Sequence, residues 1–339
     1  MSHSVRILPA DRTIRVGGNE SVLEAALREG FGFPYSCRNG SCGACFGELL
    51  EGTISYPNGP PAVLGEADEA AKLAVFCQAR PTSDLVVRAE EITQTRAQVV
   101  RTMPVRVERI DDLASDVKRL WLRLPPNERM QYLAGQYVDV VLRDGRRRSF
   151  SIASAPRSDS LLELHVRLSP GGRFTGYVFD ALRARDLLRI EGPLGTFFLR
   201  DSPLPAILVA GGTGFAPLKA IVEDQMAQGG GRELHLFWGA RGTGDLYLHE
   251  LAESWCDAGV LRYTPVLSEP GADAWEGVTG WVHAAVLASY PQLAGHEVYR
   301  CGPPAMINAA RRDFATAGLA RERLHFDAFD YAEDNSGNR

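Results

Sequence analysis

The chain has 339 residues and a net charge of −5, with 45% hydrophobic and 23% charged residues. This composition excludes a disordered or membrane-embedded chain, and the length favours two or three domains. The weak negative charge gives no general attraction to nucleic acid or anionic lipid, so neither is expected as a partner. Residues 1–12 contain no apolar segment of signal-peptide length, so the expected location is the cytoplasm.

The first predicted domain covers residues 1–93. Alternating apolar residues predict strands over 5–8 and 13–16, and a helical pattern covers 21–29. A further strand is predicted over 84–88. The polar stretch that follows predicts a linker over about 93–102.

Four cysteines in this region form the most specific motif of the chain. The spacing is Cys37-x4-Cys42-x2-Cys45, with Cys77 further along, and it is the plant-type ligand spacing of a 2Fe-2S cluster. Thiolates stabilise ferric iron, and the small residues over 40–44 leave room for backbone amides beside the bridging sulfides. A structural zinc site and a disulfide are the alternatives.

Residues 4–92 resemble the plant-type ferredoxin family. The resemblance implies an α+β β-grasp domain that holds the cluster near the surface. It also implies that Cys37, Cys42 and Cys45 share one loop and that Cys77 lies beside a returning strand.

The second predicted domain covers residues 102–200. Short alternating strands over 105–110, 137–142 and 161–166, with a helix over 175–182, predict a small antiparallel β-barrel. A basic run leads into Ser149-Phe150-Ser151 directly after a strand. Such a run is, by itself, usually a solvated loop.

Together with its downstream segments, this region resembles the FAD domain of the ferredoxin reductase flavoprotein family. The resemblance implies that Arg148 neutralises the flavin diphosphate, that Phe150 stacks on the isoalloxazine and that Ser151 hydrogen-bonds flavin N5. Phe150 replaces the usual tyrosine, so the stacking survives without a hydroxyl hydrogen bond. The implied flavin-site residues are Arg148, Ser149, Phe150, Ser151, His165, Val166, Arg167, Gly172, Arg173 and Thr175.

The third predicted domain covers residues 203–330. Apolar strands over 206–210, 234–238, 262–267 and 297–300 alternate with helical stretches, which predicts an α/β domain with a parallel sheet. Gly211-Gly212-Thr213-Gly214 forms a strand-to-helix turn where a diphosphate can approach the backbone. An ordinary tight turn is the alternative. His235, His249 and His283 are expected at surface or helix positions.

The glycine-rich turn, the segment around Gly239 and Arg241, and Cys301-Gly302-Pro303 together resemble the nicotinamide domain of the same family. The resemblance implies that Cys301 lies near nicotinamide C4, which makes Ser151 and Cys301 the catalytic candidates. Alternatively, Cys301 is a small buried core residue. The implied residues of this site are Gly212, Thr213, Gly214, Pro217, Gly239, Arg241, Cys301, Gly302 and Pro303, with Phe329 as a lid over the flavin.

Only Arg241 is an obvious partner for a phosphate on the adenine ribose, so NADH is favoured over NADPH. The residues that follow Asp330 are expected to be disordered.

The domain order resembles the reductase components of bacterial multicomponent oxygenases, including terephthalate, benzoate and phenol systems. That resemblance implies electron transfer from NADH through FAD and a 2Fe-2S cluster to a separate terminal oxygenase, with a Rieske-type partner favoured over a haem or di-iron one. A flavin fits between a two-electron donor and a one-electron acceptor. The alternatives are a reductase that serves a deoxysugar dehydratase and a non-enzymatic electron-carrier module.

Overall fold

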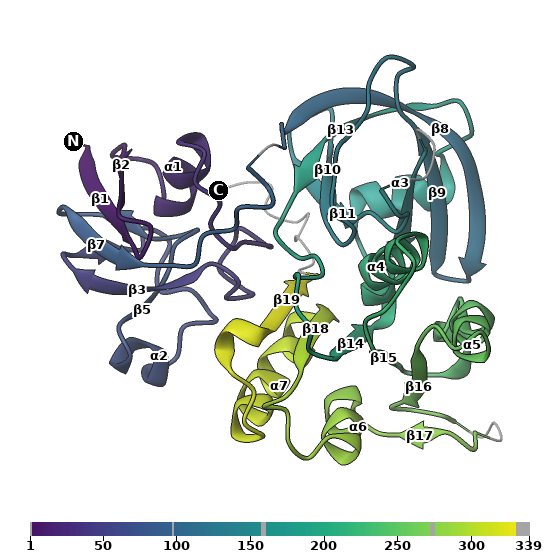
Figure 1. Ribbon diagram of the computed structural model, residues 1–339. Coiled ribbons are helices and arrows are strands. Elements are labelled where there is room, and N and C mark those ends of the chain that lie inside the picture. Colours follow the sequence, from purple (N-terminus) through teal and green to yellow (C-terminus); the bar gives the residue numbers. More distant parts are fainter. Residues whose placement is uncertain (1, 97, 157–160, 272–274, 330–339) are drawn as a thin grey trace. The chain divides into compact units, whose positions relative to one another are not determined.

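The computed structural model describes residues 2–96, 98–156, 161–271 and 275–329 (Figure 1). The chain divides into two compact units. The first contains Met1–Gln98 with the short segments Gly195–Phe197 and Phe326–Ala328, and the second contains the remainder. Residues 330–339, where disorder is expected, lie outside the described part. No described helix is long and apolar enough to cross a membrane.

The first unit is built on a mixed sheet with the strand order β2-β1-β7-β3-β5. β1 pairs antiparallel with β2 and parallel with β7, and this is the expected β-grasp arrangement. The elements are β1 (His3–Leu8), β2 (Arg12–Val16), α1 (Val22–Arg28), β3 (Phe46–Glu51), β4 (Ile54–Ser55), α2 (Glu66–Ala70), β5 (Leu73–Val75), β6 (Arg80–Pro81) and β7 (Leu85–Arg88).

Alternation and capping explain these elements. Val5 and Ile7 of β1 and Ile14 of β2 are buried on the face that packs against α1 and the phenylalanine-rich core. α1 begins at a capping box in which Ser21 accepts from the Glu24 amide and Glu24 accepts from the Ser21 amide. The strands and the helix expected here are therefore confirmed.

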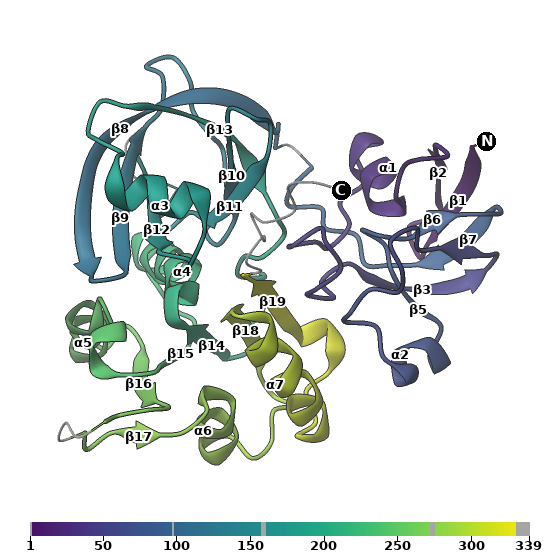
Figure 2. The ribbon, with the colours of Figure 1, turned by 180° about the vertical axis from the view of Figure 1, so that it is seen from behind.

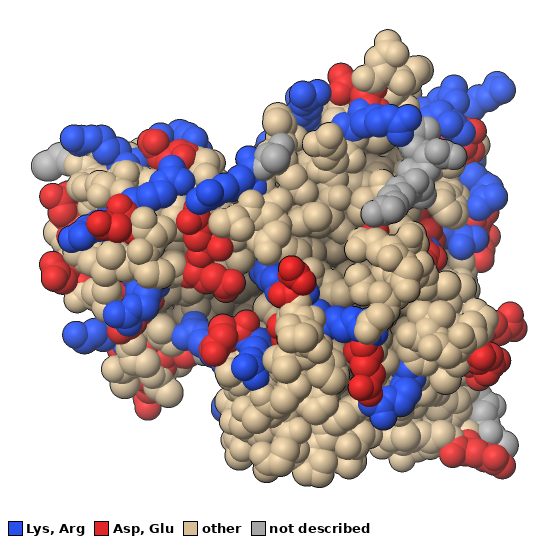
Figure 3. Space-filling view, viewed as in Figure 1, with Lys and Arg blue, Asp and Glu red and all other residues tan. Residues whose placement is uncertain are grey.

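On the face that Figure 3 shows, the Lys and Arg side chains of the first unit are interspersed with Asp and Glu side chains.

The second unit begins with a barrel in which every strand pair is antiparallel. The strand order is β11-β10-β13-β8-β9-β12, and a bridge between Ile152 and Leu164 joins the two edges. The elements are β8 (Arg101–Ala114), β9 (Val117–Arg123), β10 (Tyr137–Val141), β11 (Arg147–Ser151), β12 (Leu161–Arg167), α3 (Arg173–Asp180) and β13 (Leu187–Leu194). The expected antiparallel barrel is confirmed.

A mainly parallel sheet with the order β17-β16-β15-β14-β18-β19 follows the barrel. Figures 1 and 2 both show α4 between this sheet and the barrel. The elements are β14 (Ala206–Gly211), η1 (Gly212–Gly214), α4 (Phe215–Ala227), β15 (Leu234–Ala240), η2 (Thr243–Asp245), α5 (His249–Asp257), β16 (Arg262–Leu267), β17 (Val278–Thr279), α6 (Val282–Ser289), β18 (Glu297–Gly302), α7 (Pro304–Thr316), η3 (Arg321–Arg323) and β19 (Leu324–Ala328).

One histidine expectation is wrong. His235 lies in β15 and is buried, with its ring nitrogens 2.9 Å from the Tyr290 hydroxyl and 2.9 Å from Thr264 Oγ1. The strand places the ring in the sheet core, and two hydroxyl partners satisfy it there. His249 and His283 lie on α5 and α6, as expected.

Candidate functional site

The four cysteines of the motif lie together in the first unit. Cys37, Cys42 and Cys45 belong to the loop between α1 and β3, and Cys77 follows β5 directly. Their side chains form two hydrogen-bonded pairs, Cys37 with Cys42 and Cys45 with Cys77. The hydrogen bond from Cys42 lowers the pKa of the Cys37 thiol to about 5.

This arrangement fits a 2Fe-2S cluster, in which each iron takes two thiolates from the protein. A structural zinc ion needs four ligands around a single centre. All six cysteines are free in the structure.

The cysteine loop depends on two glycines in the left-handed region. Gly43 has a φ of +81°, and a Cβ there would lie 2.5 Å from Phe46 Cε2. Gly40 has a φ of +84°, with Pro61 and Gln78 at 3.1 Å from the same position. Only glycine tolerates both this conformation and this crowding. The loop can thus wrap a cluster closely.

Backbone amides already point at the sulfurs. The Ala44 N–H donates to Cys42 Sγ over 3.4 Å, and the Cys77 N–H donates to Cys45 Sγ over 3.4 Å. Hydrogen bonds to cysteine sulfur stabilise negative charge on a cluster and tune its potential.

Two residues before Cys37 hold the loop through partners that the sequence analysis did not identify. The Tyr35 N–H donates to Thr196 Oγ1 over 2.8 Å, and the Thr196 N–H donates back to the Tyr35 carbonyl over 3.0 Å. Ser36 Oγ donates to the Asp327 carboxylate. All four residues are buried in the first unit. No local pattern could reveal these contacts, because Tyr35 and Thr196 are 161 positions apart in the sequence and Ser36 and Asp327 are 291 positions apart.

Four of the expected flavin residues, Arg148, Ser149, Phe150 and Ser151, lie along β11. Ser149 Oγ donates to Asp139 Oδ1 over 2.6 Å, and Ser151 is buried at the end of the strand. The Phe150 ring is partly buried, with its centroid 5.4 Å from that of Phe174. Burial lowers the pKa of the Arg148 guanidinium, which nevertheless keeps its positive charge. An aromatic face and a cation therefore lie on one strand.

The other expected flavin residues have varied surroundings. Val166 is fully buried in the barrel core, and both ring nitrogens of His165 have protein partners. Arg167 lies 3.3 Å from Asp116 and 3.2 Å from Asp245. Val166 thus packs into the barrel interior, whereas His165 points to the opposite face of β12, towards Tyr247. Arg167 lies between Asp116 of the barrel and Asp245 of η2.

The loop before α3 is tightly closed. The Ser169 N–H donates to Thr175 Oγ1 over 3.2 Å, and a Cβ on Gly172 would lie 2.5 Å from that hydroxyl oxygen. Arg173 opens the helix, 3.5 Å from Asp144. Backbone amides at a helix start of this kind favour a phosphate.

The glycine-rich turn and the Cys-Gly-Pro segment meet at the carboxyl ends of β14 and β18. A Cβ on Gly214 would lie 2.0 Å from the Cys301 carbonyl oxygen, and one on Gly302 would lie 3.1 Å from Gly211 Cα. Cys301 is fully buried, and the Phe329 N–H donates to the Gly302 carbonyl over 2.9 Å. Ligands of open parallel sheets bind at this edge.

The remaining expected residues border the same edge. Gly212, next to Thr213, has a φ of +53°, and a Cβ there would lie 3.3 Å from Arg167 Nη1. Pro217 lies in the first turn of α4, Pro303 precedes α7, and Gly239 at the end of β15 packs against Val282. The Arg241 side chain is 67% exposed and lies 3.5 Å from the Asp245 carboxylate.

The chain matches three domain families in succession. Residues 5–82 match the 2Fe-2S iron-sulfur cluster binding domain, residues 104–199 the oxidoreductase FAD-binding domain, and residues 208–312 the oxidoreductase NAD-binding domain. The expected fold class and cofactors are confirmed.

Full-length relatives share this order. The chain is 39% identical to a CDP-6-deoxy-L-threo-D-glycero-4-hexulose-3-dehydrase reductase of Yersinia pestis, over 97% of this chain and 99% of the relative. It is 35% identical to reductase component 2 of terephthalate 1,2-dioxygenase from Comamonas sp., over 97% and 98%. The crystal structure of an Amycolatopsis cytochrome P450 reductase superposes with a TM-score of 0.75 at 35% identity, covering 96% of this chain and 98% of that chain.

Proposed function

The chain belongs to the family of iron–sulfur flavoprotein reductases that combine 2Fe-2S, FAD-binding and NAD-binding domains, and we propose that it transfers electrons from NADH to a separate protein acceptor. The observation that carries the proposal is the presence of three electron-handling domains on one chain. The protein is an oxidoreductase, and the non-enzymatic carrier alternative does not explain intact FAD- and NAD-binding domains.

We assign the functional domains to residues 1–93, 102–200 and 203–330. The observed strands support these limits, because β7 ends at Arg88, β8 begins at Arg101 and β14 begins at Ala206.

When bound, the nicotinamide supplies a hydride, and the flavin and cluster divide its two electrons into single-electron transfers. In our proposal Arg148 binds the flavin diphosphate, Phe150 covers the ring system and Ser151 hydrogen-bonds its N5 edge. Gly214 lets the backbone approach the nicotinamide diphosphate, and Cys301 orients the nicotinamide ring.

The surroundings of Arg241 support NADH as the donor. Arg241 is paired with Asp245, whose carboxylate would repel a phosphate on the adenine ribose. Arg241 would therefore bind a phosphate on the adenine ribose only weakly, and we propose a preference for NADH over NADPH.

We propose a terminal oxygenase as the acceptor, in keeping with the terephthalate dioxygenase and cytochrome P450 relatives. A Rieske-type centre is favoured for an aromatic-ring-hydroxylating partner, with haem and di-iron oxygenases as the other classes. A cytoplasmic location stays a prediction from the sequence.

A deoxysugar dehydratase is the second candidate acceptor. One specific observation favours it, because the hexulose-dehydrase reductase relative is 39% identical and the dioxygenase reductase relative is 35% identical. The cofactor chemistry is the same under both assignments, so only the acceptor distinguishes them.

The test follows reoxidation of protein that NADH has reduced anaerobically. Candidate oxygenases and a deoxysugar dehydratase are added separately, and the visible absorbance of the cluster is recorded. Rapid reoxidation by an oxygenase supports the first assignment, and reoxidation by the dehydratase alone supports the second. Failure of NADH to reduce the flavin would contradict both.

A further inference from the structure

A buried polar network lies in the second unit where α4 passes the barrel. Its members are Glu163 and His165 of β12, Lys219 of α4, and Tyr247, which follows η2. The first three are 1%, 4% and 5% exposed, respectively. Charged residues are rarely buried this deeply unless they are paired.

Lys219 is fully satisfied within this network. Its Nζ lies 2.8 Å from Glu163 Oε2, 2.8 Å from Glu223 Oε1 and 3.2 Å from the Ala153 carbonyl oxygen. An ammonium group has three N–H donors, and three acceptors surround this one. The side chain is therefore held in a single position.

Glu163 continues the network through His165 to Tyr247, which follows η2. Its Oε1 lies 2.9 Å from His165 Nε2, and His165 Nδ1 lies 3.0 Å from the Tyr247 hydroxyl. Arg119 approaches Glu163 Oε1 to 3.8 Å. Burial raises the pKa of Glu163, but the His165 hydrogen bond and the Lys219 charge together lower it by more. The net pKa is below the ordinary value, so the carboxylate stays ionised.

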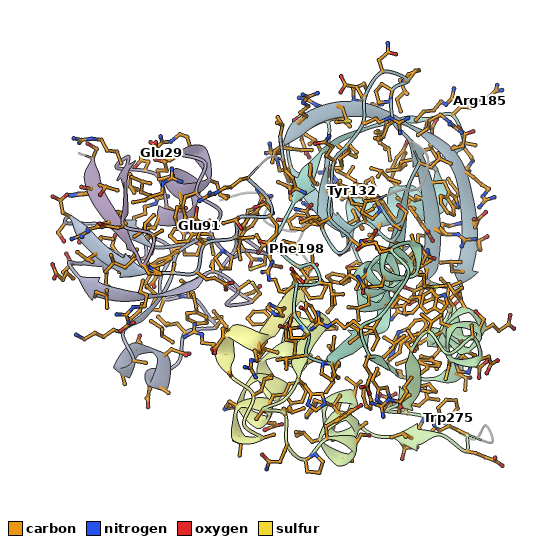
Figure 4. All side chains as sticks on the ribbon, viewed as in Figure 1. Glu29, Glu91, Tyr132, Arg185, Phe198 and Trp275 are labelled. Carbon is orange, nitrogen blue, oxygen red and sulfur yellow. The ribbon has the colours of Figure 1, made fainter. Side chains whose placement is uncertain are left out.

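The network connects the strand that carries Ser151 with the helix that starts at the glycine-rich turn. Ala153 lies two residues beyond Ser151, and its N–H donates to the Glu163 carbonyl over 2.7 Å. Tyr132, labelled in Figure 4, holds the same segment from the barrel side, with its hydroxyl 2.9 Å from the Ala155 carbonyl oxygen. Lys219 lies on α4, which begins directly after Gly214.

We propose that Lys219 and Glu163 are positioning residues that hold the glycine-rich turn and α4 in register with the flavin-binding strand for hydride transfer. The inference rests on the proposed function. Hydride transfer depends steeply on the distance and alignment of the reacting atoms. A well-packed apolar pair often stabilises a fold as well as a buried ion pair does, so retained charges suit a positional role.

The test compares flavin reduction by NADH in rapid mixing under anaerobic conditions. The double variant Lys219→Met/Glu163→Leu removes both charges of the central pair, and Glu223 and His165 each lose one partner. We expect it to keep FAD, iron and sulfide and to bind NADH with nearly unchanged affinity. Its limiting rate of flavin reduction should fall by about tenfold or more, with weaker charge-transfer absorbance between nicotinamide and flavin.

Tyr247→Phe is the milder second variant, because it removes only the hydroxyl that meets His165. We expect about threefold slower flavin reduction at unchanged NADH affinity. Lys118→Met is the matched control, since Lys118 of β9 pairs with the exposed Asp112 of β8. It should reduce its flavin at the wild-type rate.

The outcomes separate the two proposals. Wild-type rates in both the double variant and Tyr247→Phe would overturn the positioning role and leave the proposed function intact. If the network only stabilises the fold, the variants will have a lower melting temperature but an unchanged reduction rate and charge-transfer absorbance. That result would also overturn the positioning role. Wild-type protein whose flavin NADH cannot reduce would contradict the proposed function itself.

Discussion

Gly214 and Cys301 are in direct backbone contact: a Cβ added to Gly214 would lie 2.0 Å from the Cys301 carbonyl oxygen. No side chain can occupy that space, so the glycine-rich turn and the Cys-Gly-Pro segment approach each other only because residue 214 is glycine. The two motifs lie far apart in the sequence and form one edge of the parallel sheet.

Gly214→Ala should therefore separate the two segments. We expect the KM for NADH to rise by about tenfold or more, because the backbone must shift where the diphosphate is proposed to bind. Steady-state kinetics with a dye that accepts electrons from flavin measures the change. Gly295→Ala is the control, since a Cβ on Gly295 meets no atom within 4 Å. Equal KM values for the two variants would contradict the prediction.

Cys77→Ser should divide the activities of the protein. Loss of one thiolate disrupts the cluster, so reduction of one-electron protein acceptors should fall to background. NADH oxidation by a dye that accepts electrons from the flavin should continue. Iron and sulfide content and the two activities are measured together. Cys256→Ser changes an exposed cysteine and should retain both activities. If Cys77→Ser kept both, the proposed route through the cluster would be wrong.

Arg148→Ala should weaken flavin binding. The guanidinium is partly buried on β11, and its charge is proposed to neutralise the diphosphate. We expect at least about a tenfold rise in the FAD dissociation constant, the size of one charge-assisted hydrogen bond. Gel filtration followed by flavin quantification provides the measurement. Arg189→Ala, an exposed position on β13, should retain its FAD. An Arg148→Ala protein with full flavin would remove this residue from the site.

His235 should make the second unit sensitive to acid. Burial lowers the pKa of its ring to about 4, below the ordinary value of 6.5. Its contribution to stability is complete above pH 6.5 and is lost as the pH falls towards 4, because the unfolded chain takes up the proton first. The loss by pH 5 is at most about 2 kcal/mol.

Thermal unfolding at pH 7 and pH 5 checks this prediction. The melting temperature of the wild type should fall several degrees further than that of His235→Gln, which has no titrating ring. Parallel decreases in the two proteins would show that His235 does not titrate on unfolding.

Local signals predicted much of the fold and of the candidate site. The cysteine spacing identified the cluster because its chemistry requires ligands on one tight loop. The helical pattern over 21–29 predicted α1, and the apolar strands before Gly211 and Cys301 predicted the parallel sheet.

Contacts between distant segments could not be predicted in this way. Thr196 and Asp327 hold the cysteine loop, yet each lies in a segment whose local pattern shows only a loop or strand end. Lys219 occurs in a helix that reads as apolar, and its partner Glu163 alternates within a strand as an exposed residue would. Only the packing of α4 against the barrel shows that both are buried. α2 and the β4–β6 pair were missed because they are short.

We propose that electrons pass from NADH through the flavin to the cluster. The most direct measurement mixes the FAD- and iron-loaded protein anaerobically with NADH and follows flavin bleaching by absorbance and the reduced cluster by electron paramagnetic resonance. We predict that the flavin bleaches first and that the cluster signal then appears, but not in Cys77→Ser. A cluster that stays oxidised while the flavin is reduced and a one-electron protein acceptor is turned over would contradict the claim.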